Sequence, residues 1–409
     1  MLEEAEDIGR RVKRARLRLG MPQADLAAAL GKSQPWVSRI EAGTLELDSS
    51  SLISRIAAAL HVHPNDLIDR PYDSGPAENQ WQIAARSVLR ELRRYDLAPE
   101  FPGTPRPSSV LWGEVKKIHR LRNAAAHTAI IQTLPDLLRE SRALAEVSTG
   151  REREEAFAVY AVLAKSAHSN ARTLGYPELV AVASERTVWA ARLSGDPVMP
   201  AIANYVRMWD MWDTADWDDS IALAERSLNL IEEHMERGEP LAMRAYGGLQ
   251  LRAAVAAARA DRKDEARDRV QNAREVADRM NTYEGPEVFD RHSLTFTSGN
   301  VTIHGVAIEV ESRDHVRAIE LNDEADPQEI ATLPKSRRGH HHMDLARALV
   351  WNGQRDRGLE ELEHAERIAP ELVRNHPMAR SALRQIVYAE RAGVRERLRR
   401  MSDRFHLDG

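Results

Sequence analysis

The stretch Pro22–Gly43 reads PQADLAAALGKSQPWVSRIEAG and constrains this chain more than any other part of its sequence. Leucine and alanine recur at helical spacing before Gly31, which predicts a short helix that ends at this glycine. Ser33 is suited to cap a second helix, in which Val37 and Ile40 face back toward the first. The other side chains of the second helix point away, and these are Gln34, Trp36, Ser38 and Arg39. Such a helix, held by a partner helix across a tight turn, has the shape needed to enter a DNA major groove.

The distribution of charge favours the same interpretation. From Ile8 to Leu45 there are eight lysine or arginine residues and two acidic residues, so the local charge is 8 − 2 = +6, whereas the whole chain carries −5. A basic segment on an acidic chain is expected where DNA phosphates are neutralised. An ordinary helical hairpin of a bundle would also explain the spacing and the glycine turn, but it would not explain the charge.

The region Ile8–Leu67 resembles, without a gap, the DNA-binding domain of lambdoid phage repressors and of bacterial regulators of the xenobiotic-response-element type. Before the stretch described above, RRVKRARLRLGM is similar to the first helix of that family. After it, LISRIAAALHVHPNDLI is similar to the closing helical segment. The resemblance implies a DNA-binding domain of five helices over residues 1–70.

The resemblance also implies which residues meet DNA. Gln23 would begin the second helix and contact a phosphate or an end base, while Gln34 and Arg39 would reach base edges. Basic residues near the helix ends would contact phosphates. The complete set of expected DNA contacts is Arg11, Lys13, Gln23, Lys32, Ser33, Gln34, Trp36, Ser38 and Arg39.

In the same family, residues that match Arg16 and Glu41 form an internal salt bridge, and we expect one here. Two positions depart from the family pattern. Pro35 and Trp36 stand where many relatives have small or polar residues. The operator sequence therefore cannot be transferred from any relative.

Composition excludes several classes of protein. The chain has 409 residues, enough for two or three domains, and it has no cysteine, which excludes disulfides and thiolate chemistry. No apolar run approaches the ~18 residues of a membrane span, and the N-terminus has no apolar signal core, so a cytoplasmic protein without membrane contact is expected. No nucleotide-binding glycine loop, nucleophile elbow or paired-histidine metalloprotease motif is present, so we expect neither an enzyme nor a cofactor. The consecutive histidines in Gly339–His342 diverge around a helix, which argues against a metal site.

After the DNA-binding domain, the sequence predicts an all-α chain. A turn at Pro71–Gly75 and a break at Pro99–Pro107 bracket one helix, Glu78–Tyr95, in a linker over residues 71–107. Residues 108–394 then show helical patterns, with Val301–Val310 interpreted as helical despite its β-branched residues, and residues 395–409 form a tail. Turn signals precede pairs of small residues seven apart; these are Ser220 and Ser227, Ala266 and Ala273, Ala318 and Ala325, and Gly358 and Ala365. The pairs, with Pro370 at the closing position, resemble long and degenerate tetratricopeptide repeats, which implies an α-solenoid with a concave binding surface.

Residues on first helices of these repeats are candidates for that concave surface. Aromatic side chains there provide contact area, and amides can hydrogen-bond a peptide backbone or a polar small molecule. A structural core role is the alternative for the aromatic residues, and hydrogen bonds within the bundle are the alternative for the amides. The candidate ligand-binding residues are Asn204, Tyr205, Trp209, Trp212, Gln250, Asn300 and His304.

The order of the two parts resembles a large group of bacterial regulators that includes peptide-pheromone sensors. This resemblance implies a homodimeric transcription regulator that binds a double-stranded DNA operator, and whose repeats bind a peptide or small-molecule effector. The alternative is an interaction protein, in which the repeats hold a partner protein and DNA binding is secondary or autoregulatory. A concave solenoid serves both, so the sequence leaves the two open.

Overall fold

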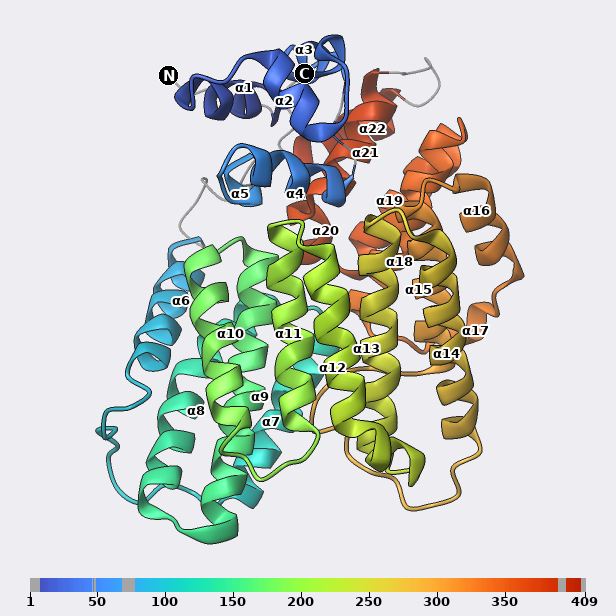
Figure 1. Cartoon of the computed structure of the whole chain (residues 1–409). Coiled ribbons are helices and arrows are strands. Elements are labelled where there is room, and N and C mark those ends of the chain that lie inside the picture. The colour runs from blue at the N-terminus through green and yellow to red at the C-terminus, as the bar shows by residue number, and fades with distance from the viewer. Residues whose placement is uncertain (1–7, 46, 48, 68–77, 389–394, 406–409) are drawn as a thin grey trace.

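The structure is a computed structural model that describes residues 8–45, 47, 49–67, 78–388 and 395–405. The described residues form helices joined by turns and loops, with no strand among them, as the sequence predicts. A small N-terminal domain, the head, lies above a larger body of paired helices (Figure 1). The predicted turn at Pro71–Gly75 falls outside the described residues.

The head consists of five helices, as expected. Its helices are α1 (Ile8–Arg18), α2 (Gln23–Leu30), α3 (Gln34–Glu41), α4 (Ser50–Ala59) and α5 (Pro64–Leu67). Leu26, Val37 and Ile53 come from three of them and are each at most 2% exposed in one core. Gly31 ends α2 in the left-handed conformation (φ 63°), where its N–H bonds the carbonyls of the last turn. The glycine therefore makes the sharp turn that the sequence predicts.

Two local expectations for α3 need correction. Ser33 occupies the N-cap position with an extended backbone, but its side chain accepts no capping hydrogen bond. Trp36 does not project freely from the helix, because it is half-buried against the head core. The Lys32 ammonium lies 5.9 Å from the centre of its ring. Burying this large apolar ring against the core is more favourable than leaving it in water, even though Trp36 lies on the polar side of α3.

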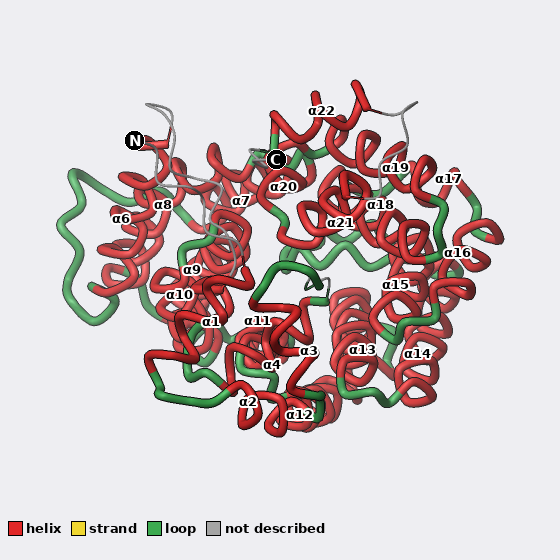
Figure 2. The backbone as a smooth tube through the Cα atoms, turned by 90° about the horizontal axis from the view of Figure 1, so that it is seen from above, coloured by secondary structure: helices red, strands yellow, loops and turns green. Residues whose placement is uncertain are grey.

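The body alternates inner and outer helices, and Figure 2 shows the helix pairs curving around a common centre. The inner helices are α7 (Ser108–Asn123), α9 (Gly150–Leu174), α11 (Met199–Asp213), α13 (Pro240–Arg259), α15 (Ser298–Glu311), α18 (Lys335–Trp351) and α21 (Pro377–Tyr388). Each packs against its partner and against the next inner helix. The outer helices are α8 (His127–Val147), α10 (Pro177–Ala191), α12 (Trp217–Glu236), α14 (Lys263–Asn281), α16 (His315–Glu324) and α19 (Arg355–Ile368). The short helices are α17 (Pro327–Ala331) and α20 (Pro370–Asn375). The β-branched passage Val301–Val310 lies within α15 and is helical, as predicted.

Small residues allow the close helix pairing that the spacing predicts. Ser220 and Ser227 on α12, like Ala266 and Ala273 on α14, are fully buried. A Cβ atom added to Gly358 on α19 would lie only 2.7 Å from Val350 Cγ2 on α18. In the α15–α16 unit only the first of the two predicted residues lies inside the outer helix, because α16 ends at Glu324.

Two helices outside the predicted repeats also belong to this body. Helix α6 (Glu78–Arg93), placed in a linker by the sequence, packs against α8 and α10 and buries Trp81, Val88 and Leu92 in the main core. Helix α22 (Arg395–Arg404), placed in a tail, packs against α21 and buries Met401. Each has an apolar stripe that is covered only by this packing.

The body curves far enough to close on itself. Helix α18 contacts α7, and α20 contacts α9, so the last helices return to the first (Figure 2). Glu371 of α20 accepts hydrogen bonds from the backbone N–H and hydroxyl of Thr128, at 3.3 and 3.4 Å. The inner helices therefore surround a centre instead of lining an open groove.

Candidate DNA-binding surface and effector site

A buried ion pair fixes α1 to α3. Arg16 and Glu41, each 6% exposed, form the pair that the family resemblance implies, with Nε–Oε1 at 2.5 Å and Nη2–Oε2 at 2.8 Å. Arg16 also donates to the Met21 carbonyl at 2.6 Å. Burial alone would raise the pKa of Glu41, but hydrogen bonds from Arg16 and Gln23 outweigh it and lower that pKa. The carboxylate is therefore ionised, and it holds the angle between the helices.

The same carboxylate begins a chain of hydrogen bonds that reaches the surface. Gln23 donates to Glu41 Oε2 at 2.8 Å, and Gln34 donates to Gln23 Oε1 at 2.6 Å. Gln34 is exposed, whereas Gln23 is half-buried. The two glutamines, which the resemblance assigns to DNA, are thus positioned on one face by the buried pair.

The outward surface of the head is formed by the first turn of α3 and its flanks. Arg39 is exposed, and its guanidinium makes no hydrogen bond or ion pair with any described residue. Lys13 is likewise exposed, Ser38 and Lys32 are half-buried, and Ser33 is exposed. Arg11 is half-buried and already interacts with another group of the protein. In Figure 1, α3 lies on the side of the head away from the body, so this surface is open to a ligand as large as DNA.

The opposite side of the head rests on the body. Helix α4 contacts α11, and Met378 of α21 is 2% exposed within the head core. His63 Nε2 lies 3.6 Å from Asp213 Oδ2 at the end of α11. Arg172 of α9 holds the same carboxylate at 2.5 and 2.8 Å. Burial would raise the pKa of Asp213, but Arg172 and His63 lower it to about 2. The head is thus joined to two inner helices of the body.

The predicted ligand-binding residues divide into two groups in the structure. Trp212 is 7% exposed, and its indole N–H donates to Ser220 at 3.1 Å, which places it between α11 and α12. Gln250 is 5% exposed and accepts from Arg269 of α14 at 3.4 Å. The polar atoms of both side chains therefore bond to the outer helix of their own pair, α12 for Trp212 and α14 for Gln250. The Trp212 ring also lies 5.1 Å from the Arg252 guanidinium.

The other predicted ligand residues remain candidates. Asn204, Tyr205 and Trp209 on α11 are half-buried. Asn300 on α15 is 3% exposed, and its Oδ1 has no hydrogen-bond partner among the described residues. His304 Nδ1 lies 2.7 Å from the Asn300 carbonyl, and burial followed by the Arg337 charge lowers the pKa of His304 to about 3. This histidine is therefore neutral at physiological pH.

Arginine side chains, which the sequence analysis did not single out, complete this region. The Arg252 guanidinium lies 3.7 Å from the Tyr205 ring centre and 4.4 Å from that of Trp209. Stacking of this kind orients a guanidinium and leaves its N–H groups directed past the rings. The sequence gives no local signal for Arg252, because it lies in an alanine-rich helix with no motif around it. Its position becomes apparent only when the closed body brings the inner helices together.

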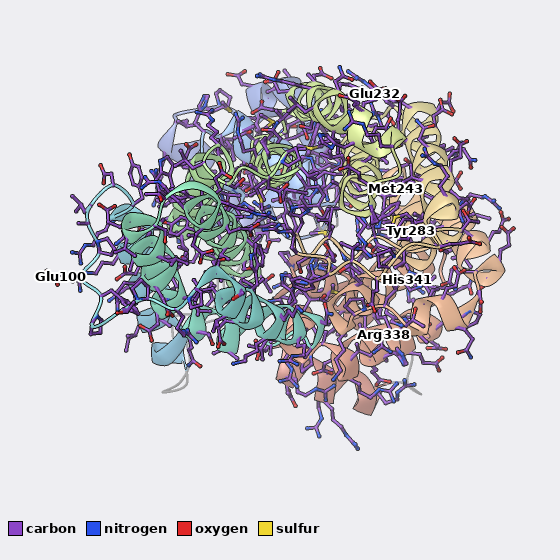
Figure 3. The ribbon with its side chains drawn as sticks, turned by 90° about the horizontal axis from the view of Figure 1, so that it is seen from below. Glu100, Glu232, Met243, Tyr283, Arg338 and His341 are labelled. Atoms are coloured by element: carbon purple, nitrogen blue, oxygen red, sulfur yellow. The ribbon has the colours of Figure 1, made fainter. Side chains whose placement is uncertain are left out.

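The long connection between α14 and α15 was also not predicted, and it crosses the lower side of the body. Residues 282–297 run from the end of α14, marked by Tyr283 in Figure 3, toward α7 and α9. Phe289 stacks against His119 at 5.4 Å, and His292 Nε2 lies 2.9 Å from Asp196 Oδ2. A small hollow of about 290 Å³ beside Met243 and Tyr283 opens where this segment leaves α14. Gly285 and Pro286 were the available sequence signal for an irregular segment.

The described residues contain no group of three or more histidine, aspartate or glutamate side chains arranged to hold a metal ion. His342, from the run of histidines, has its Nδ1 2.6 Å from Glu361 Oε2. In the described part of the chain, no helix is both long and apolar enough to cross a membrane.

Comparison with known proteins agrees with the geometry of the head. Residues 7–70 match the family model described as a helix-turn-helix domain. The head is therefore a helix-turn-helix domain. Among solved structures, the chain is similar to PlcR of Bacillus thuringiensis in a crystal structure with the peptide PapR7 and DNA. The sequence identity is 16%, the TM-score is 0.29, and the match covers 68% of this chain and 96% of that chain. A search of curated proteins found no match.

Proposed function

We propose that this protein is a cytoplasmic, homodimeric transcription regulator whose body binds an effector and thereby alters how the heads engage an operator. The observation that carries the proposal is the position of the head. Its polar face with Arg39 is directed outward, while its other side rests on α11 and α21, which belong to the inner row of the body. A ligand among the inner helices thus has a direct structural connection to the DNA-binding domain.

Dimerisation belongs to the proposal for a physical reason. One head presents few side chains to base edges, and two heads on half-sites about 34 Å apart gain both affinity and sensitivity to their spacing. An effector acts on such a system only if it binds one arrangement of heads better than another. Sedimentation equilibrium of the full chain tests this, and a monomer with and without operator DNA would contradict it.

The proposed contacts with DNA are the outward residues of the head. Arg39, on the exposed face of α3, would read a guanine edge, with Gln34 beside it. Lys13 and Lys32 would contact phosphates, together with Arg11. The remaining proposed contacts are Gln23, Ser33, Trp36 and Ser38. The half-buried positions of Gln23, Trp36 and Ser38 suit backbone contacts at the edge of the groove better than base contacts.

The test is to select an operator from random DNA with the wild-type chain and to measure affinity by fluorescence anisotropy. Arg39→Ala should cost about 1–3 kcal/mol and relax the preference at one base position. Arg226→Ala, at an exposed arginine on α12, is the matched control and should leave binding unchanged. An equal loss of affinity for every DNA sequence would make Arg39 a phosphate contact and contradict its proposed role.

The alternative, a scaffold that holds a partner protein, makes a different prediction for the same molecule. It requires an exposed surface on the body, whereas the polar groups without partners that we find on the inner helices are enclosed. This enclosure favours a ligand small enough to enter.

A further inference from the structure

Four cationic side chains from four inner helices come together at the centre of the body. They are Arg122 of α7, Lys165 of α9, Arg252 of α13 and Arg337 of α18. Burial and then the charges of Arg122 and Arg252 lower the pKa of Lys165 to about 7. Burial and then the charge of Arg337 lower the pKa of Arg122 to about 10. Arg122 and Lys165 meet at the Ser293 carbonyl, and Arg252 stacks on Tyr205, the side chain on which Arg337 and Lys165 also act. We call the region around these four side chains the cationic centre.

The charge of the cationic centre is not balanced by its hydrogen bonds. Lys165 Nζ donates to the carbonyls of His292 and Ser293, at 2.7 and 3.3 Å. Arg122 donates to the same Ser293 carbonyl and to the Thr295 hydroxyl. These acceptors are neutral, so they do not cancel the charge, and Arg122 Nε has no hydrogen-bond partner among the described residues. The carboxylate that acts on both cations is the one of Asp290.

The other two cations have unused donors. Arg252 is 7% exposed, and its Nη1 has no hydrogen-bond partner among the described residues. The Arg337 guanidinium makes no hydrogen bond or ion pair within the described part of the chain, although the residue is half-buried. A buried guanidinium N–H without an acceptor is costly, so an unfilled position in its direction is the simplest explanation.

Side chains beside the cationic centre are only partly buried. Burial is the largest influence on the pKa of Tyr205 and of His304, yet each side chain keeps part of its surface accessible. Burial would raise the pKa of Tyr205, but Arg252 and Arg337 together lower it to about 7. The local field is therefore strongly positive.

We propose that the cationic centre binds an oxyanion group, a carboxylate or a phosphate, of the effector. This inference rests on the proposed function and defines the ligand class of that site. Guanidinium groups match the paired oxygens of either anion, and Arg252 is already oriented by its stacking on Tyr205 and Trp209. A negative ligand would reduce the mutual repulsion of these basic groups and favour the charged form of Lys165, as well as supply the missing acceptors.

The experiment measures the melting temperature of the full chain in chloride, inorganic phosphate and citrate at equal ionic strength. Phosphate or citrate should raise the melting temperature of the wild type in a saturable way, because a ligand that binds only the folded state stabilises it. Arg337→Gln should melt above the wild type in chloride, since one repelling charge is gone. It should also bind the stabilising anion about tenfold more weakly, as expected for the loss of one charged hydrogen bond. Arg226→Gln on α12 is the control and should match the wild type in all three salts.

The two probes separate the sources of the oxyanion, since a response to phosphate alone assigns a phosphate group and a response to citrate alone a carboxylate. Arg252→Gln is the second variant and should also lose the response. A wild-type melting temperature that is equal in the three salts would overturn the proposal. So would equal responses in the wild type, Arg337→Gln and Arg252→Gln, because the anion would then be an adventitious ion only. If the anion binds as expected but operator affinity does not change with it, the anion site stands and the effector function fails.

Discussion

The buried pair between Arg16 and Glu41 allows the sharpest stability prediction for the head. Glu41→Gln keeps the size of the side chain and its ability to accept from Gln23, but it removes the negative charge. Arg16 is then left 6% exposed with its charge opposed by a neutral amide. Breaking a buried pair from one side typically costs about 3–5 kcal/mol, because the stranded charge cannot be hydrated.

This cost is comparable to the whole stability of the head. A domain of about 60 residues has a free energy of unfolding of about 3–9 kcal/mol, at ~0.05–0.15 kcal/mol per residue. The body does not depend on this pair, because its cores are formed by other helices. Glu41→Gln should therefore unfold the head at a lower denaturant concentration than the body, so that one chain shows two transitions.

Hydrogen exchange read by mass spectrometry separates the two parts. In Glu41→Gln we expect faster exchange in peptides from α2 and α3 and unchanged exchange in peptides from α9 and α13. Arg16→Met combined with Glu41→Leu is the matched control, and it should recover most of the protection because no charge is stranded. A loss of about 1 kcal/mol should persist, since the Met21 carbonyl loses its donor. Unchanged exchange in α2 and α3 of Glu41→Gln would refute the reasoning.

The same pair sets a pH dependence of defined sign. The pKa of Glu41 is lower in the folded head than in the unfolded chain, so the folded state binds fewer protons near that pKa. Its stabilisation is fully present above the ordinary carboxyl pKa and is lost as the pH falls through the lowered value. Acid should therefore lower the free energy of unfolding of the head in the wild type. Glu41→Gln should lack this part of the pH dependence.

Three further predictions concern other sites. Lys13→Ala with Lys32→Ala should reduce the slope of log affinity against log salt by about two units without changing the preferred operator, whereas an unchanged slope would remove these lysines from the DNA contact. Trp212→Ala should lower the free energy of unfolding of the body by about 3–5 kcal/mol in urea, because it empties a core position between α11 and α12; a wild-type midpoint would instead make this tryptophan a surface residue. The Asp213 carboxylate should stabilise the fold above about pH 4, and this stabilisation should be lost as the pH falls toward about 2. Asp213→Asn should therefore melt below the wild type above about pH 4, and the difference in melting temperature should disappear in acid. Equal pH profiles of the two proteins would show that the ion pair with Arg172 does not stabilise the fold.

The head could be predicted almost completely from the sequence because its signals are local. Gly31 requires a left-handed turn, Val37 and Ile40 define the buried side of a short helix, and the charges of its flanks oppose the rest of the chain. The exceptions are Ser33, whose hydroxyl makes no capping hydrogen bond, and Trp36, whose position on a polar face suggested exposure. The burial of Trp36 depends on a core formed by several helices, which no local pattern contains.

The centre of the body could be predicted only in part, since it depends on which way each inner helix turns and on where the solenoid ends. Tyr205 and Trp209 follow the expected face of α11, whereas Trp212 and Gln250 point into their own helix pairs. Trp209 and Trp212 lie three residues apart with their rings at 6.4 Å, so a small rotation about the helix axis decides between the two outcomes, and degenerate repeats do not specify it. The arginines of the cationic centre come from segments more than 200 residues apart, and only closure of the body brings Arg122 and Arg337 together.

Two of the helices around the cationic centre also lead to the head. On α11, Tyr205 lies eight residues before Asp213, about 12 Å along the axis at a rise of ~1.5 Å per residue. Asp213 in turn faces His63 of the head. On the other side, α18 carries Arg337 and packs against α21, whose Met378 lies in the head core. An anion that neutralised Arg252 and Arg337 would reduce the repulsion between α13 and α18 and favour tighter closure of the body. Because the head rests on α11 and α21 together, we expect a change in closure to alter both of its supports and the position of the outward α3.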